Sequence, residues 1–224
     1  MRLGVLYSGG KDSNYALLKE KHNVVCLISI ISKNKESFMF HTPNIHMVEL
    51  QAEAIGLPLL QKTTEGEKEK ELEDLKTVIK EAKEKFKLAG IVTGAIESKY
   101  QADRIQKICD DLKLKCVNPL WHKDQEELLN ELIEHKFKVI ISGVFAYGLD
   151  KSLLGKELDR KMIDKLVSLK EKYKINPAGE GGEIETTVLD APFFNKKIEI
   201  LESEIKAKED SGIFIIKKAK LVAK

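Results

Sequence analysis

A stretch near the start of the chain, SGGKDS at residues 8–13, combines groups that suit a phosphate ligand. It follows an apolar run and precedes a helix-like run, and backbone N–H groups at the start of a helix favour negative charge. Its two glycines allow the backbone to approach a ligand closely and to adopt positive φ. Its lysine adds a positive charge, and its two serines add hydroxyl donors. The stretch therefore predicts an anion site rather than an ordinary turn.

The P-loop is the first phosphate motif to compare with this stretch. Its template, G-x-x-x-x-G-K-[ST], fails because Gly10 stands where the lysine belongs and Asp12 follows Lys11. The stretch instead resembles the PP-loop of the ATP pyrophosphatase superfamily, whose pattern is SGGxDS. That resemblance implies cleavage of ATP between the α and β phosphates. It also implies transfer of AMP to a carbonyl or carboxylate oxygen, followed by displacement by a nitrogen or sulfur nucleophile.

A second informative stretch, GEGGEIETT at residues 179–187, places three glutamates among glycines before a predicted strand. The glycines permit close approach of the backbone to a ligand, and clustered carboxylates bind cations. A solvated acidic loop is the alternative interpretation, and the spacing alone leaves both open.

Three stretches behind the PP-loop, in this order, make a family resemblance specific. They are GAIESKYQADR at residues 94–104, PLW at residues 119–121 and the GEGGEIETT stretch, and together they resemble the diphthine–ammonia ligase family. The resemblance runs from Met1 to about Phe194, with Ile184 standing where the family often has an aromatic residue. It implies the last step of diphthamide synthesis on elongation factor 2. ATP would adenylate the diphthine carboxylate, and ammonium would displace AMP to give the amide.

The residue chemistry and the resemblance together assign roles to individual residues. The predicted catalytic residues are Lys11, Asp12, Glu183 and Glu185. The predicted nucleotide site is Ser8, Gly9, Gly10, Lys11, Asp12, Ser13, His41 and Gly94. The predicted substrate site is Ser98, Tyr100, Gln101, Arg104, Glu180, Glu183 and Thr186. The expected cofactors are ATP and Mg²⁺, with Asp12 as the metal ligand, and which glutamate takes the proton of ammonium stays open.

Two of these residues have structural alternatives. Asp12 either helps to hold the metal or caps the first helix. Arg104 is one of three arginines among 38 lysines and arginines. A planar guanidinium grips phosphate or carboxylate with two hydrogen bonds, which lysine does not reproduce. Arg104 lies three residues after Gln101, on the same helix face. A surface ion pair with Glu97 or Asp103 is the alternative.

The first half of the chain must position these residues, and it alternates predicted strands and helices. Strands are expected at 3–7, 24–31, 57–61, 90–93 and 114–117, and helices at 13–21, 42–55, 68–86 and around 102–112. Such a series predicts a parallel sheet covered by helices on both faces, with ligands bound at the carboxyl ends of the strands. The PP-loop resemblance implies a HUP-like five-stranded sheet of order 3-2-1-4-5.

The second half predicts a smaller α+β domain. Asp124 and Glu127 form a capping box for a helix at 125–135, and a second helix is expected at 160–174. Strands are expected at 139–145, 188–189, 197–205 and 212–219. We therefore predict a nucleotide-binding domain at 1–118 and a C-terminal substrate-binding domain at 119–224.

The amino-acid composition limits which classes of binding partner are expected. Charged residues make up 33% of the chain, yet the net charge is only +2, which disfavours a nucleic-acid surface. No apolar run reaches the roughly 18 residues of a membrane span and no signal-peptide pattern is present, so a cytoplasmic protein without a membrane partner is expected. Elongation factor 2 and ammonium are the expected partners. The oligomeric state is open, with a homodimer among the alternatives.

Other classes of protein remain as alternatives. A PP-loop enzyme that modifies tRNA by thiolation usually brings a C-x-x-C pair, whereas Cys109 and Cys116 stand seven residues apart. An amidotransferase needs a glutaminase nucleophile, and no motif for one is present. A protein that binds ATP without turnover is the non-enzymatic alternative.

Overall fold

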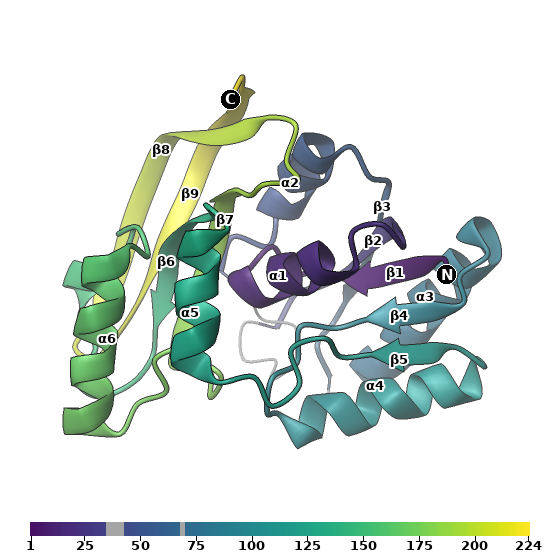
Figure 1. The fold of residues 1–224 in the computed structure, drawn as a ribbon, viewed down its shortest axis with the longest axis horizontal. Coiled ribbons are helices and arrows are strands. Elements are labelled where there is room, and N and C mark those ends of the chain that lie inside the picture. Colours follow the sequence, from purple (N-terminus) through teal and green to yellow (C-terminus); the bar gives the residue numbers. More distant parts are fainter. Residues whose placement is uncertain (35–42, 68–69) are drawn as a thin grey trace.

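A computed structural model describes residues 1–34, 43–67 and 70–224 of the chain. Within them two sheets lie side by side (Figure 1). The first has five parallel strands in the order β3-β2-β1-β4-β5, and the second has four strands in the order β7-β6-β9-β8, paired antiparallel. The predicted fold class, including its strand order, is confirmed.

In the first half, the described residues form nine elements. They are β1 (Leu3–Leu6), α1 (Lys11–Glu20), β2 (Val24–Ser32), α2 (Met47–Ile55), β3 (Leu59–Thr64), α3 (Lys70–Phe86), β4 (Gly90–Val92), α4 (Lys99–Asp111) and β5 (Lys115–Val117). The central strands form because they are short apolar runs that a sheet covered on both faces can bury. The type and order of the elements follow the prediction, and the bounds differ by a few residues.

Helices cover both faces of the parallel sheet. On one face, α3 and α4 pack against side chains such as Cys26, Ile28 and Ile91. On the other face, α1 and α2 pack against side chains such as Leu3 and Leu27. Because alternate residues of a strand point to opposite faces, Leu27 and Ile28 belong to different cores. The helices α1 and α2 therefore lie between the two sheets, as Figure 1 shows.

The second half contains α5 (Gln125–Glu134), β6 (Lys138–Val144), a short 3₁₀ turn (Lys151–Leu153), α6 (Arg160–Tyr173), β7 (Ile184–Asp190), β8 (Lys197–Lys208) and β9 (Ser211–Val222). Asp124 caps α5 by accepting a hydrogen bond from the Glu127 N–H at 2.9 Å, as predicted. The predicted start of β7 at residue 188 is wrong, since the strand begins at Ile184. The acidic loop therefore leads directly into a strand.

The first helix begins earlier than predicted. Gly10 is its N-cap residue, and Lys11 rather than Ser13 is its first residue. The interpretation of Asp12 as the N-cap is therefore wrong. An extended Gly10 (φ −80°, ψ 173°) starts the helix, which places Lys11 and Asp12 in the first turn.

The predicted domain boundary after residue 118 stays a prediction. The apolar core between α1, α2 and the parallel sheet continues without a break into the antiparallel sheet, through residues such as Leu128, Ile141 and Val188. The Tyr15 hydroxyl of α1 also donates a hydrogen bond to the Glu131 carboxylate of α5. Among the helices that the structure describes, none combines the length and apolar character that a bilayer crossing requires.

Candidate active site

The glycine loop turns its carbonyl groups toward protein donors. The Gly10 carbonyl accepts hydrogen bonds from Asn14 Nδ2 at 2.9 Å, from Ser13 Oγ at 3.1 Å and from the Asn14 N–H at 3.2 Å. The first N–H groups of a helix have no intrahelical partner. That of Lys11 donates to Thr186 Oγ1 at 3.1 Å. The N–H groups of Asp12 and Ser13 are then the ones that the helix start offers to an anion.

Lys11 and Asp12 form an ion pair in the first turn of α1. Lys11 Nζ lies 3.0 Å from Asp12 Oδ1 and 2.8 Å from Oδ2. The lysine side chain is 4% exposed, whereas that of Asp12 is 31% exposed. A buried ammonium needs a partner to offset its lost hydration, so Asp12 holds the lysine in place while keeping an accessible edge.

Strand β7 of the second sheet completes the loop. Besides the Thr186 contact, the Val188 N–H donates to the Gly9 carbonyl at 3.1 Å. The backbone of Thr186 also runs close to Gly10, since a Cβ added at Gly10 would lie 3.3 Å from the Thr186 carbonyl oxygen. The PP-loop is therefore shaped by both halves of the chain.

A cavity of about 740 Å³ opens over this loop, at the carboxyl ends of the parallel strands. One part is apolar and is lined by Leu6, Ile28, Ile30, Leu75 and Ile105. Another part carries the charged groups Lys11, Asp12, Glu180 and Glu185. An apolar cleft with a few convergent polar groups is the usual form of a ligand site, and the apolar part suits a flat nucleobase.

Among the charged residues of this cavity, Glu185 is the one whose pKa lies furthest from its ordinary value. Burial raises its pKa to about 7, and the nearby Asp12 carboxylate adds to the rise while Lys11 opposes it. The ring of Phe145 lies nearby: a Cβ added at Gly143 would lie 2.6 Å from Phe145 Cε2 and 3.0 Å from Glu185 Cβ. The ring thus lies over Gly143 beside Glu185. A carboxyl group with a pKa near neutrality can exchange protons at physiological pH.

Glu180 links the acidic loop to the first half of the chain. Its Oε1 accepts hydrogen bonds from the N–H groups of Glu97 at 2.8 Å and Ser98 at 2.9 Å, just before α4. Burial raises the pKa of Glu180, although these two N–H groups act in the opposite direction. Glu180 and Ser98 both line the cavity, so this contact ties the acidic loop to the start of α4 at the cavity wall.

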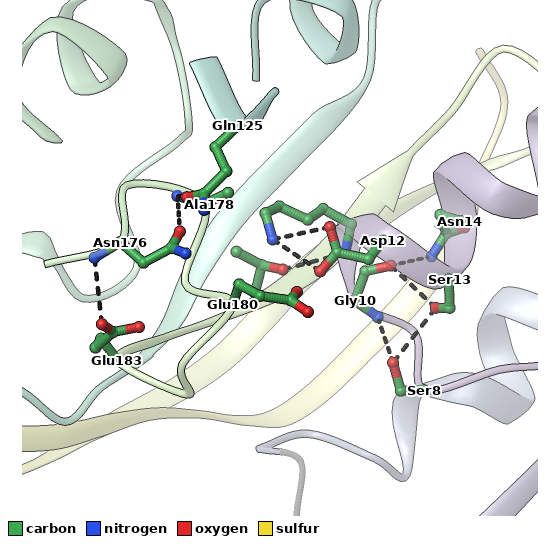
Figure 2. A network of polar contacts seen from close by, with 12 residues as sticks. Ser8, Gly10, Asp12, Ser13, Asn14, Gln125, Asn176, Ala178, Glu180 and Glu183 are labelled. Atoms are coloured by element: carbon green, nitrogen blue, oxygen red, sulfur yellow. Dashed lines mark hydrogen bonds and ion pairs between the residues drawn. The ribbon is translucent and has the colours of Figure 1, made fainter. Parts of the chain in front are cut away.

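Glu183 lies apart from the other two glutamates. Its Oε1 accepts a hydrogen bond from the Asn176 N–H at 3.2 Å and its Oε2 accepts one from the Gly181 N–H at 3.0 Å. In Figure 2 it lies beside Asn176, with Glu180 between it and Asp12. The carboxylate of Glu183 therefore holds the conformation of its own loop. Glu183 is not among the described residues that line the cavity.

The predicted substrate residues of α4 divide into two groups. Ser98, Tyr100 and Gln101 line the cavity, and Ser98 also caps the helix by accepting from the Gln101 N–H at 3.4 Å. Arg104 instead stacks on the Tyr100 ring, with its guanidinium carbon 3.5 Å from the ring centroid. It lines a separate hollow between α3 and α4. The shared helix face predicted for Gln101 and Arg104 thus does not bring both to the cavity.

The remaining predicted residues lie as follows. Ser8 and Ser13 line the cavity, and their Oγ atoms are 3.3 Å apart. His41 lies outside the described residues. Among the described residues, no group of three or more His, Cys, Asp or Glu side chains is arranged to hold a metal ion.

Gly94 packs directly on the start of α1. A Cβ added there would lie 2.8 Å from the carbonyl carbon of Asp12 and 2.9 Å from the Ser13 nitrogen. Because these are backbone atoms, Gly94→Ala would have to push α4 away from the PP-loop. We expect the melting temperature to fall, at a cost of about 1–3 kcal/mol, and ATP binding to weaken. Differential scanning fluorimetry with and without ATP measures both effects. An unchanged melting temperature and nucleotide affinity would contradict the close packing.

Sequence reasoning missed several residues of the site. Asn14 follows the PP-loop directly and could have been found as a helix-start donor. Phe145 and Gly143 lie in a predicted strand with no motif, and only the pairing of β6 with β7 brings them beside Glu185. Gln51 is a buried residue of α2 that touches the loop, and nothing in its sequence neighbourhood marks it.

The fold and this site together define a class of protein. A glycine loop after the central strand of a 3-2-1-4-5 parallel sheet, with a lysine and an aspartate in the following helical turn, is the arrangement of a PP-loop ATP-using enzyme. The chain belongs to the diphthamide synthase family. The family model for the diphthamide synthase N-terminal domain matches residues 1–116, and that for the C-terminal domain matches residues 124–222.

Individual relatives agree with this assignment. The chain is 39% identical to the diphthine–ammonia ligase of Bos taurus and 38% identical to that of Homo sapiens. Each alignment covers 92% of this chain and 85% of the relative. A solved structure described as a predicted subunit of a tRNA methyltransferase from Methanocaldococcus jannaschii aligns with a TM-score of 0.44 and 20% identity, over 85% of this chain and 97% of that one. That likeness is too weak to bear on function.

Proposed function

We propose that this protein is an ATP-dependent amide ligase that converts the carboxylate of diphthine on elongation factor 2 into the amide of diphthamide. The single observation that carries the proposal is that one cavity holds both the Lys11–Asp12 pair of the PP-loop and Glu185 of β7. The Lys11–Asp12 pair suits the activation of a carboxylate by ATP, and Glu185 suits the attack of ammonium. Membership of the diphthamide synthase family supports the choice of substrate.

The first step is adenylation. A carboxylate oxygen of diphthine attacks the α-phosphorus of ATP, the bond to the β-phosphate oxygen breaks, and pyrophosphate leaves. Charge builds up on the phosphates as this happens, and the N–H groups of the α1 start together with Lys11 stabilise it. The apolar part of the cavity takes the adenine. The acyl adenylate has AMP as a good leaving group, which a free carboxylate lacks.

The donor set around Asp12 fits Mg²⁺. This ion is commonly bound by one or two carboxylates together with substrate phosphates and water, and Asp12 is a partly exposed carboxylate at the phosphate loop. When bound, the ion would neutralise phosphate charge. Asp12 would then exchange part of its contact with Lys11 for a contact with the metal. The Nζ group of Lys11 would thereby become free to bind the phosphates.

The second step is amidation. Ammonia nitrogen attacks the acyl carbon, the C–O bond to AMP breaks, and the nitrogen loses a further proton to solvent as the amide forms. Ammonium has no lone pair, so it must lose a proton before it attacks. Glu185 is the group that we assign to take that proton, because its carboxyl lines the cavity and its pKa of about 7 matches the task. Glu183 is assigned to the shape of the loop instead.

Mass spectrometry of the protein substrate tests the proposal. Elongation factor 2 bearing diphthine would be incubated with this protein, ATP, Mg²⁺ and ammonium. We expect a mass loss of about one dalton with AMP appearing alongside, as displacement on an activated acyl group requires. AMP without a mass change would move the substrate elsewhere, with tRNA as the next candidate. The absence of AMP would favour an ATP-binding protein without turnover. Light scattering of the same preparation would distinguish a monomer from a homodimer.

A further inference from the structure

Gln51 is a buried polar residue at the junction of α2, the PP-loop and β7. Gln51 as a whole is 0% exposed to solvent. Its side-chain amide donates from Nε2 to the Gly9 carbonyl at 2.9 Å and to the Val188 carbonyl at 2.8 Å. The Val188 N–H donates to the same Gly9 carbonyl at 3.1 Å. Three parts of the chain that are far apart in sequence therefore meet at one carbonyl group of the phosphate loop.

The chemistry of this junction suits an amide at position 51. Both partners of the side chain are carbonyl oxygens, so the side chain must act as a donor, and Nε2 carries two N–H groups for the two carbonyls. The Oε1 atom of Gln51 has no hydrogen-bond partner among the described residues. A buried acceptor without a partner is unfavourable, and an apolar residue would avoid that cost, as the neighbouring Val48 and Ala52 of α2 do. The two donated hydrogen bonds are the gain that offsets it.

The conformation of Gly9 shows what those hydrogen bonds hold. Gly9 has φ +80°, a left-handed conformation, and Gln51 Oε1 lies 2.4 Å from the place that a Cβ on Gly9 would occupy. A loop that binds phosphate must present N–H groups to the anion and keep its carbonyl oxygens away from it. We propose that Gln51 is a positioning residue for ATP binding, which holds the Gly9 carbonyl away from the phosphates and ties the loop to β7.

Two substitutions test this role, which rests on the proposed use of ATP. Gln51→Glu keeps the shape of the side chain but replaces its donor with an acceptor that faces two carbonyls. Gln51→Met keeps most of the volume and removes the hydrogen bonds. Isothermal titration with an α,β-methylene analogue of ATP measures affinity without turnover. We expect the dissociation constant to rise by about tenfold or more in Gln51→Glu, and by a smaller factor in Gln51→Met.

The controls separate positioning from a purely structural role. Glu53→Gln lies two residues along α2 with an exposed side chain, and its affinity should match that of the wild type. A structural role alone would lower the melting temperature and the fraction of active protein without changing the dissociation constant. That result in either Gln51 variant would overturn the inference, and Gln51→Met decides if Gln51→Glu does not fold. Failure of the wild type to bind the analogue would instead count against the proposed function.

Discussion

Replacing Lys11 with methionine is expected to reduce AMP formation by about a hundredfold to a thousandfold, the usual cost of removing one group that stabilises charge in a transition state. The lysine side chain is 4% exposed and lies at the start of α1, beside the N–H groups offered to the phosphates. Methionine fills its space, so the fold should persist. Release of AMP at saturating ATP measures the effect, and circular dichroism checks the fold. Lys11→Ala should behave similarly, with an added loss of packing.

Lys19 supplies the matched control for this prediction. It is a lysine of the same helix, its side chain is 38% exposed, and its partner Glu131, of which the side chain is 22% exposed, lies 3.5 Å away. Lys19→Met should therefore leave AMP formation within about twofold of the wild type, as a surface ion pair contributes little. Full activity in the Lys11 variant would refute the assignment of this loop as an ATP site. An equal loss in both variants would point to the helix rather than to the charge at position 11.

The prediction of the fold from sequence succeeded where local chemistry and burial agree. The apolar run of β2 and the glycine loop after β1 both carry strong local signals, and the order 3-2-1-4-5 followed from the PP-loop resemblance. Element bounds were less accurate. The start of α1 moved from Ser13 to Lys11 because Gly10 is extended and acts as the N-cap, and a cap is set by backbone geometry that residue types only suggest.

The site was predicted by motif rather than by contact, and this explains its gaps. The acidic loop was singled out by its motif, but three glutamates in nine residues have the same type and nearly the same context. Only the structure separates Glu183, which binds its own loop, from Glu180, which binds the start of α4, and from Glu185, which lines the cavity.

Residues that act through tertiary contacts left no trace in the sequence. Gln51 reaches Gly9 only because α2 packs between the two sheets, and Phe145 reaches Glu185 only because β6 pairs with β7. Arg104 is the opposite case, and its role in substrate binding stays a prediction. Its residue type suggested an anion ligand, yet stacking on Tyr100 directs its guanidinium to the α3–α4 hollow. A residue type indicates what a side chain can do, whereas packing decides where it does it.

Glu185→Gln is expected to separate the two chemical steps. Adenylation does not need this group as a base, so AMP transfer to the protein substrate should persist. Amide formation from ammonium should fall by about a hundredfold or more, because glutamine accepts no proton. Hydroxylamine is largely uncharged at neutral pH and needs no base before it attacks, so the variant should form the hydroxamate at the wild-type rate. Mass spectrometry of the protein product distinguishes amide from hydroxamate.

The pH dependence supplies an independent test of Glu185. Its pKa of about 7 means that the carboxyl is protonated below that pH and ionised above it, so wild-type amide formation should rise as the pH passes through 7. The charged groups that act on it are Asp12, which raises this midpoint, and Lys11, which lowers it. In Glu185→Gln the midpoint near 7 should disappear, which leaves only the steady rise that follows the fraction of free ammonia. Glu183→Gln is the matched control: its carboxylate holds the loop, so amide and hydroxamate should fall together and the midpoint should stay near 7. Equal losses of amide and hydroxamate in Glu185→Gln would instead place Glu185 in adenylation or in the fold, and would remove it from proton transfer.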